Sequence, residues 1–326
     1  GLMLLIRVDA APDLGFGHLT RMIYLASQIR HRGEVVFAVR ENKDASRLLE
    51  SRRIDWRPAG EVWKSDLAGC SGVLFDLRHF TAEDDSLLER ARARGIPTVQ
   101  VTDLGLERRA ADWRVDAAIA PEPPYPAETP GLLGPQAALL HHSFRHFHQV
   151  PRKYRCRNRH LLLTLGGGAS YRDLRRLIDL LHRHGFQLKI ALGFSMKKAV
   201  GRVLRRLYPG VHFVGAVQSL ARPLFEADTA ILAPGVTAFE AAACGTPAIY
   251  LSHDPFQGRH AAQFAAAGAG IDLGLLAALD EAALLSALTG LTREGRSAMG
   301  TAGKELVDGQ GTRRLIDLLT TQEMIR

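Results

Sequence analysis

The sequence predicts an α/β protein made of two doubly wound domains, each built on a parallel sheet, that face a cleft. Three observations predict this class. The chain has 326 residues, about twice the length of a typical domain. Short apolar runs alternate with segments of helical periodicity, as in parallel strand and helix units. Two such units, at residues 2–29 and 161–184, join strand to helix through a glycine-rich turn.

Composition places the chain among ordinary globular proteins, because 46% of its residues are hydrophobic and 23% are charged. No apolar run reaches the roughly 18 to 20 residues that span a bilayer. The sequence has no secretory signal pattern, and its three cysteines lie far apart. We therefore expect a cytoplasmic protein without a disulfide framework or a membrane span, present as a monomer or weak homo-oligomer.

A net charge of +8 favours anionic partners, such as nucleotide sugars, nucleic acid or anionic lipid. Most of this charge is arginine scattered along predicted helix faces, and no nucleic-acid-binding signature accompanies it. We expect a small anionic substrate and no nucleic-acid partner.

The first unit combines a strand at 2–8 with a helix whose apolar residues recur from Leu19 to Ile29. Gly15 and Gly17 in the turn between them allow a ligand to approach the backbone. His18 and Arg21 lie three residues apart and so share a face of the first helical turn. A helix start at the carboxyl end of a strand favours an anion or an ionisable catalytic group. A surface histidine that only begins a helix is the alternative interpretation.

Dinucleotide binding is disfavoured by two residues of this unit. Thr20 stands where the Rossmann fingerprint has its third glycine. Arg40 stands after the next predicted strand, 35–39, where a carboxylate would hold the ribose.

Two aspartates of the first domain follow predicted strands. The remaining predicted elements are strands at 35–39, 72–75, 97–101 and 116–120 and helices at 44–52 and 82–94. Asp76 and Asp103 come directly after strands, at the sheet edge where ligands bind. We predict that they contact the substrate, and capping of the next helix is the structural alternative.

The connection between the domains is predicted at residues 121–160. Residues 121–135 are rich in proline and glycine and predict a long loop. Residues 139–160 are dense in histidine and arginine, but no carboxylate stands among the histidines, which disfavours a metal site. We interpret this stretch as a solvated basic connection and divide the chain into domains 1–150 and 151–326.

The second domain repeats the strand, glycine turn and helix. After the strand at 161–165, Gly167 and Gly168 precede the helix at 174–184, and their backbone amides suit a phosphate. Further elements are predicted as strands at 187–192, 211–214 and 229–232 and helices at 281–289 and 313–319.

A second group of candidate residues lies between 233 and 270. Gly235 precedes a helix on which Thr237 can hold a phosphate oxygen and Glu240 can accept both ribose hydroxyls. Gln257 and His260 follow in the next loop and helix and are further candidates for the substrate-binding site. The alternative is a helix cap with a solvated glutamate.

The pattern R-x-D-x5-G-F-G-H-x-x-R resembles the opening of the UDP-sugar hydrolases of the pseudaminic acid pathway and of related spore-coat polysaccharide proteins. Those hydrolases cleave UDP-2,4-diacetamido-2,4,6-trideoxy-β-L-altropyranose. Here the matching residues are Arg7, Asp9, Gly15, Gly17, His18 and Arg21. The resemblance implies a GT-B-like fold, a catalytic His18 and glycines that face a pyrophosphate. Asp9 and Arg21 are further catalytic candidates. Arg21 would stabilise the charge that builds on the departing diphosphate, and a plain helix-surface position is its alternative.

Residues 233–270 likewise resemble the donor-nucleotide site of GT-B proteins. This resemblance implies that Gly235, Thr237 and Glu240 hold phosphate and ribose and that Gln257 contacts the sugar or pyrophosphate. Two departures stand out: Phe256 replaces the usual asparagine before the glutamine, and the family's tyrosine and one aspartate are absent around Asp76 and Thr102. The resemblance also implies that the last helix crosses back to the first domain.

The implied reaction is hydrolysis of a UDP-activated deoxy amino sugar at its anomeric carbon, without metal or other cofactor. A GT-B glycosyltransferase using a UDP-sugar donor is one alternative. A nucleotide-sugar-binding protein without catalysis is another.

Overall fold

The computed structural model describes residues 2–11, 15–102, 107–120, 130–194, 196, 198–215 and 219–326. It divides into two compact units, Gly1–His141 with Gln310–Arg326, and His142–Gly309. The predicted division between 150 and 151 falls after helix α5 (His142–Gln149), which the structure groups with the second unit.

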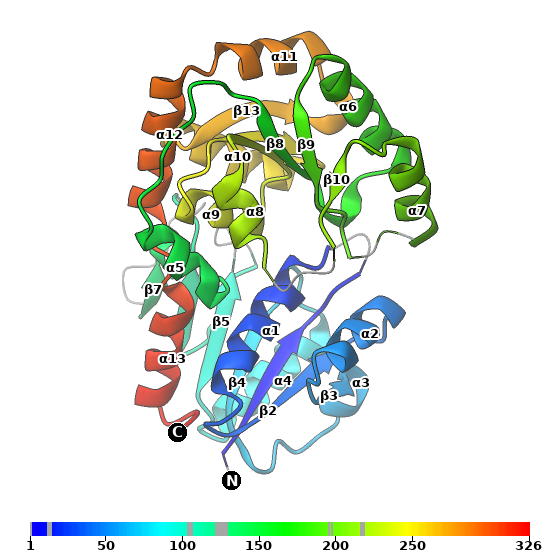
Figure 1. The fold of residues 1–326 in the computed structure, drawn as a ribbon. Helices are drawn as coiled ribbons and strands as arrows, with labels where there is room; N and C mark the ends of the chain where they lie inside the picture. Colours follow the sequence, from blue (N-terminus) through cyan, green and yellow to red (C-terminus); the bar gives the residue numbers. More distant parts are fainter. Residues whose placement is uncertain are drawn as a thin grey trace. The chain divides into compact units, whose positions relative to one another are not determined.

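The first unit has a seven-stranded parallel sheet in the order β3-β2-β1-β4-β5-β6-β7 (Figure 1). Its strands are β1 (Met3–Val8), β2 (Glu34–Val39), β3 (Trp56–Pro58), β4 (Cys70–Asp76), β5 (Thr98–Thr102), β6 (Trp113–Asp116) and β7 (Gly131–Leu133). Its helices are α1 (Gly17–Ile29), α2 (Lys43–Ser51), α3 (Ala59–Val62), α4 (Ala82–Ala93) and α13 (Gly311–Thr321), with a 3₁₀ turn η1 (Pro135–Ala137).

The second unit has a six-stranded parallel sheet in the order β10-β9-β8-β11-β12-β13. Its strands are β8 (His160–Thr164), β9 (Gln187–Ile190), β10 (His212–Phe213), β11 (Thr229–Leu232), β12 (Ala248–Ser252) and β13 (Gly270–Leu275). Its other helices are α6 (Tyr171–Arg183), α7 (Lys198–Leu207), α8 (Ala221–Glu226), α9 (Val236–Ala243), α10 (Pro255–Ala266), α11 (Glu281–Gly290) and α12 (Arg293–Leu306), with 3₁₀ turns η2 (Gly166–Gly168) and η3 (Leu276–Ala278).

The strands are nearly continuous apolar runs because helices cover both faces of each sheet. In β1, Leu4, Ile6 and Val8 pack in one core cluster, whereas Leu5 packs in the cluster on the opposite face. This alternation is the two-residue period of a strand. The apolar pattern of such a strand therefore fixes its place in the middle of the sheet.

Each sheet reverses its winding direction at one point, between β1 and β4 in the first unit and between β8 and β11 in the second. In open α/β sheets, ligands bind outside the carboxyl ends of the strands at such a point. The loops after β1 and β4, and those after β8 and β11, are therefore where a site is expected in each unit.

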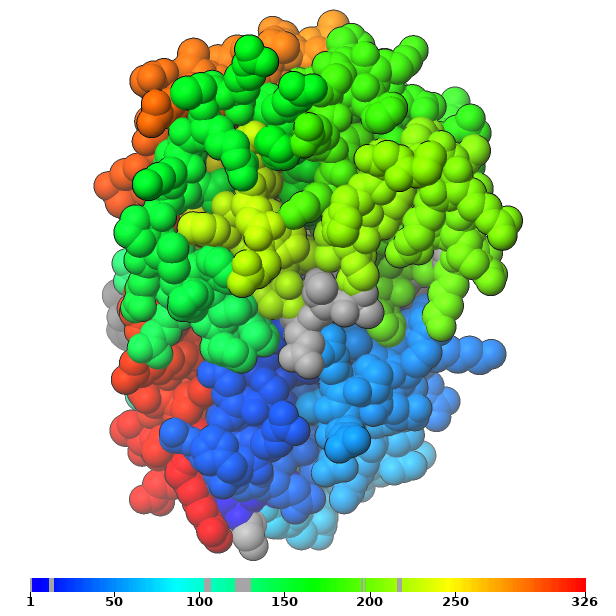
Figure 2. Space-filling model, viewed as in Figure 1, coloured from blue at the N-terminus to red at the C-terminus, as the bar shows by residue number. Residues whose placement is uncertain are grey.

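Helix α13 completes the core of the first unit. Leu315, Leu319, Met324 and Ile325 are buried in the same cluster as β1. Ser71 in β4 donates a hydrogen bond to the Met324 carbonyl at 2.6 Å. In Figure 2 the red atoms of α13 lie beside the blue atoms of α1, and the two helices are in contact.

Two sequence-based expectations are wrong. The strand predicted at 116–120 lies instead at Trp113–Asp116, because the Asp116 carboxylate accepts a hydrogen bond from the Ala118 N–H at 2.8 Å and turns the chain. The basic stretch after residue 139 is not a uniformly solvated connection. Its Phe144 is fully buried in α5, and Arg152 donates hydrogen bonds to backbone carbonyls of the second unit.

Among the described residues, no helix combines the length and apolar character needed to cross a bilayer.

Candidate functional site

The loop after β1 brings the predicted motif residues to the start of α1. Gly15 has a φ of +78°, a backbone conformation that side chains disfavour, and its N–H donates to the Ala11 carbonyl at 2.7 Å. Helix α1 then begins at Gly17 without a side-chain cap and without an acidic residue in its first turn. The positive end of the helix is therefore not neutralised by the helix itself.

His18, Arg21 and Asp76 form one hydrogen-bonded cluster at the point where the first sheet reverses direction. His18 Nδ1 lies 2.6 Å from Asp76 Oδ1. Arg21 donates from Nε to Asp76 Oδ2 at 2.6 Å and from Nη2 to Asp76 Oδ1 at 2.5 Å. Asp76 ends β4, which neighbours β1, so the sheet order itself brings its carboxylate to the first turn of α1.

The charge state of Asp76 follows from these contacts. Burial of its fully enclosed carboxyl raises its pKa, but the charges and hydrogen bonds of Arg21 and His18 lower it more, so the net shift is downward. The ionised carboxylate can only accept, and therefore His18 Nδ1 carries the proton. Arg21 Nη2 also lies 3.1 Å from His18 Nδ1, because both nitrogens contact the same oxygen, Asp76 Oδ1.

This tautomer leaves the lone pair of His18 on Nε2. The His18 side chain is 18% exposed, whereas Asp76 is fully buried. A histidine fixed in this way through Nδ1 can accept a proton at Nε2 from a water or hydroxyl. Asp76 thus contacts His18 and Arg21 in the structure, where the sequence had suggested a contact with substrate.

Asp9 belongs to a different buried network. Arg7, which is fully buried in β1, donates to both Asp9 oxygens at 2.6 and 2.8 Å and to Asp84 at 2.7 Å. Arg40 adds hydrogen bonds from its backbone N–H and its Nε. The structure therefore does not bring Asp9 into the His18 cluster, and these contacts favour a supporting role for it over a catalytic one.

The glycine turn after β8 is shaped by its neighbours. Gly166 has a φ of +64°, and a Cβ on Gly168 would stand 3.0 Å from the His253 ring. Helix α6 begins after this turn with a capping box, in which Ser170 and Asp173 bond each other's backbone N–H. The carboxylate of Asp173 already lies at the start of α6. The turn with Gly167 and Gly168 therefore attracts an anion less strongly than the sequence suggested.

The loop after β11 leads to a helix start that is open to an anion. Helix α9 follows Gly235 without a side-chain cap and without an acidic residue in its first turn, and Thr237 lies half-buried there. Unpaired N–H groups at such a start bind phosphate. The start of α9, with Gly235 and Thr237, can therefore accept an anion.

Glu240 lies one turn deeper in α9. It is 6% exposed, and no described residue donates a hydrogen bond to its carboxylate. Burial raises the pKa of Glu240 to about 7. A buried carboxyl without a protein donor is costly unless a ligand supplies one.

Gln257 and His260 differ from each other in their surroundings on α10. Gln257 accepts a hydrogen bond from the His253 N–H at 2.8 Å, next to the helix cap Asp254. His260 is 3% exposed and packs edge-to-face against Phe256 and Phe239. These contacts favour a packing role for His260 over the predicted contact with a nucleotide. Asp103, the remaining candidate, lies outside the described residues.

Two residues at the end of β12, Ser252 and His253, were not singled out from the sequence. His253 Nε2 lies 2.6 Å from the Leu165 carbonyl and contacts Gly168, so it joins this loop to the glycine turn. The Ser252 hydroxyl is buried and has no hydrogen-bond partner among the described residues. The sequence Ser-His-Asp at the end of a buried strand is the pattern that could have identified them.

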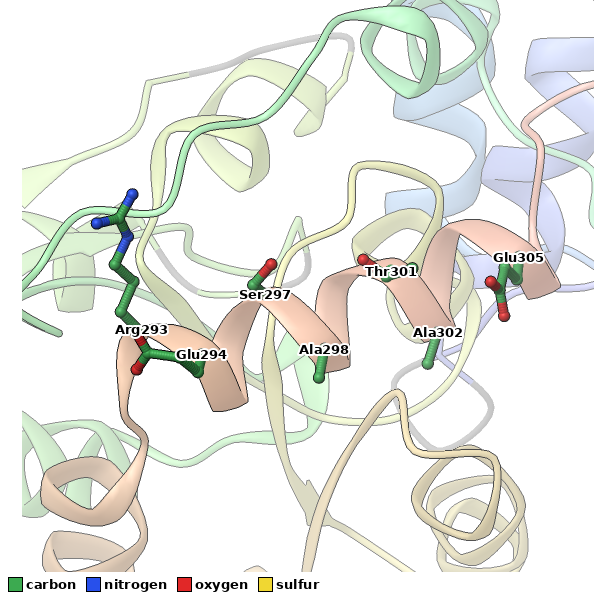
Figure 3. Close-up of a pocket in the computed structure, with 7 residues that line it drawn as sticks. All are labelled: Arg293, Glu294, Ser297, Ala298, Thr301, Ala302 and Glu305. Atoms are coloured by element: carbon green, nitrogen blue, oxygen red, sulfur yellow. The ribbon is translucent and has the colours of Figure 1, made fainter.

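Two surface depressions are lined by residues other than these candidates. A depression of about 590 Å³ runs along α12 between Arg293 and Glu305 and is lined mainly by small side chains (Figure 3). A smaller one of about 120 Å³ lies near Cys70. Within the described part of the chain, no three histidine, cysteine, aspartate or glutamate side chains converge as a metal site would require.

No protein-family model matches the chain. It is 24% identical over 339 residues to the spore coat polysaccharide biosynthesis protein SpsG of Bacillus subtilis (strain 168), and the alignment covers 96% of this chain and 96% of SpsG. Solved structures share the fold, and two of them serve as examples. The spinosyn rhamnosyltransferase SpnG complexed with spinosyn aglycone has a TM-score of 0.67 at 15% identity, covering 99% of this chain and 100% of SpnG. The UDP-GlcNAc 2-epimerase of Neisseria meningitidis bound to UDP-GlcNAc has a TM-score of 0.61 at 13% identity. This match covers 98% of this chain and 100% of the epimerase chain. The chain therefore has the GT-B fold and is similar over 96% of its length to a protein of spore-coat polysaccharide biosynthesis.

Proposed function

We propose that this protein hydrolyses a UDP-activated deoxy amino sugar at the anomeric carbon and releases UDP and the free sugar for surface polysaccharide or nonulosonic acid synthesis. The observation that carries the proposal is the hydrogen bond between His18 Nδ1 and the buried Asp76 carboxylate. It leaves Nε2 as a general base of fixed orientation in a half-buried position.

In the proposed reaction, His18 Nε2 takes a proton from water while the water oxygen forms a bond to the anomeric carbon. The bond between that carbon and the diphosphate oxygen breaks, and UDP leaves with the electron pair. Asp76 stabilises the imidazolium that forms, and Arg21 keeps Asp76 ionised through its two hydrogen bonds. The His18 proton then returns to solvent.

The nucleotide is proposed to bind at α9. The uncapped helix start after Gly235 supports a role in holding the diphosphate, and N–H groups there stabilise the charge that develops on the leaving UDP. The buried Glu240 carboxylate, which has no donor among the described residues, supports a bond to the ribose hydroxyls.

A glycosyltransferase remains the second candidate because the structural likeness to SpnG supports it equally. The same His18 base would then remove a proton from an acceptor hydroxyl in place of water. Binding without turnover is the third outcome that an assay can return.

One assay separates these candidates. The protein is incubated with a panel of UDP-sugars in ¹⁸O-labelled water, with and without acceptor sugars, and UDP and sugar are followed by mass spectrometry. Hydrolysis at the anomeric carbon predicts UDP release in water alone, with ¹⁸O in the sugar and none in UDP. Release only with an acceptor identifies a transferase. Binding of UDP-sugars without release under either condition refutes both enzymatic readings.

A further inference from the structure

Helix α7 carries positive charge that the helix itself does not balance. Its sequence, KAVGRVLRRL, has four cations in ten residues and no acidic residue. Arg205 lies over the Phe213 ring. Lys198, Arg202 and Arg206 are exposed, and no carboxylate of the described residues pairs with any of them. By contrast, the arginines of α6 share their helix with Asp173 and Asp179.

Large apolar side chains are exposed on α7 and just before it. Five such side chains are well exposed in the described part of the chain, and three of them lie here: Val203 at 45% and Leu207 at 47% on α7, and Phe194 at 41% before it. Exposed aliphatic and aromatic groups are unremarkable one by one, but their concentration on a short segment indicates an interaction surface.

Helical geometry arranges these residues in two rows. Gly201 and Leu204 are buried and fix which side of α7 faces the core. Val203 and Leu207 are four residues apart and therefore form one exposed row. Arg202 and Arg206 are also four apart and form the adjacent row. Figure 1 shows α7 at the margin of the second unit, near its edge strand β10, and Figure 2 shows this region at the surface.

We propose that α7, with Phe194 before it, docks the protein onto an anionic lipid surface. A short helix that lies in a bilayer interface places apolar residues among the acyl chains while flanking arginines reach the phosphate headgroups. Both rows of α7 fit this arrangement. A nucleic-acid site would explain the arginines but not the exposed Val203 and Leu207, and the charge selects anionic over zwitterionic lipid. The proposal does not depend on the reaction that the protein catalyses.

The test is co-sedimentation of the full chain with vesicles of phosphatidylcholine alone or with 30% phosphatidylglycerol, a mixture chosen at roughly the charge density of anionic membranes. Binding is expected only to the anionic vesicles and is expected to weaken as salt is added. R202Q/R206Q should lower the partition coefficient about 25-fold, since each cation near the surface contributes about fivefold. V203S/L207S should lower it by at least about tenfold by removing buried carbons.

Matched controls lie elsewhere on the surface. L133S/L275S removes two other exposed apolar side chains, and R172Q/R293Q removes two other exposed arginines. Neither pair should change vesicle binding, and all variants should keep the wild-type circular dichroism spectrum. Equal binding to both vesicle types, or α7 variants that bind like the controls, would overturn the proposal. So would self-association in sedimentation velocity that V203S/L207S abolishes without any binding to lipid, because α7 would then be a protein interface.

Discussion

Arg21 donates two parallel hydrogen bonds to the Asp76 carboxylate, from Nε to Oδ2 at 2.6 Å and from Nη2 to Oδ1 at 2.5 Å. The pair is nearly excluded from solvent, since the two side chains are 7% and 0% exposed. Its effect reaches His18, which shares the Oδ1 oxygen. A buried ion pair in the first unit thus sets the orientation and tautomer of the proposed base.

Replacing the base itself should separate chemistry from binding. His18→Ala is expected to keep the fold and the affinity for UDP but to lose about 10²- to 10⁴-fold in turnover, the scale of general base assistance. UDP release is the measurement. His79→Ala is the matched control, because this histidine is 64% exposed in the same unit and should turn over normally. Normal turnover in His18→Ala would remove His18 from the mechanism.

Asp76→Asn tests the positioning role. The amide can donate to His18 Nδ1 and so permits the wrong tautomer, and it removes the counter-charge of Arg21. Turnover should fall with unchanged KM, and the free energy of unfolding should fall by up to about 3 to 5 kcal/mol, the cost of breaking a buried pair. Asp44→Asn, in an exposed ion pair of α2, should change both by little. If Asp76→Asn keeps wild-type turnover while losing stability, the carboxylate is structural only.

Acid should destabilise the first unit through Asp9 and Asp76. Burial raises the pKa of each, but Arg7 for Asp9 and Arg21 for Asp76 lower it more, so both folded values lie below the ordinary 3.8. Groups with depressed folded pKa values stabilise the protein above their unfolded pKa and lose this contribution as the pH falls through the folded value. Urea unfolding between pH 7 and pH 2 should therefore show stability declining below about pH 4. Asp9→Asn should flatten that decline, and an unaltered pH profile would contradict this account.

Glu240 should couple nucleotide binding to proton release. Its pKa is about 7 in the free protein because of burial. Ribose hydroxyls that donate to the carboxylate would favour its ionised form, so UDP affinity should rise with pH through neutrality. Calorimetry in buffers of different ionisation enthalpy measures the released proton, which Glu240→Gln should abolish.

Truncation of Glu240 measures how much free energy its carboxylate contributes to UDP binding. Glu240→Ala should weaken UDP binding by about 1 to 3 kcal/mol, the scale of a buried polar contact left unmade. Glu305→Ala, at an exposed position of α12, is the control. Unchanged affinity in Glu240→Ala would refute its contact with ribose.

The fold class was predictable because buried parallel strands leave continuous apolar runs and their helices leave a clear period. The strand β6 (Trp113–Asp116) was not predicted at its true position because the buried Arg114 interrupts its apolar pattern. The alanines that follow have the apolar character expected of a strand. This strand ends where the Asp116 side chain accepts a hydrogen bond from the Ala118 N–H, and the apolar pattern of the sequence does not reveal that contact.

The site was less predictable because pairing depends on strand order. Asp76 follows a strand in the sequence, but only the neighbouring of β4 and β1 brings it to His18. His260 stands among plausible ligand residues, yet the rings of Phe239 and Phe256 enclose it. Local patterns identify candidate groups, but Asp76, the partner of Arg21 and His18, lies 55 and 58 positions away from them in the sequence.

The return of α13 to the first unit has a consequence for how the chain is made. Ribosomes deliver residues in order, and the second unit consists of His142–Gly309. Its core can close as soon as this stretch emerges. The β1 core needs Leu315, Leu319 and Ile325 and stays incomplete until they have been synthesised. The unit that begins first is therefore the one that finishes folding last, and chaperones or proteases meet its open hydrophobic face in the meantime.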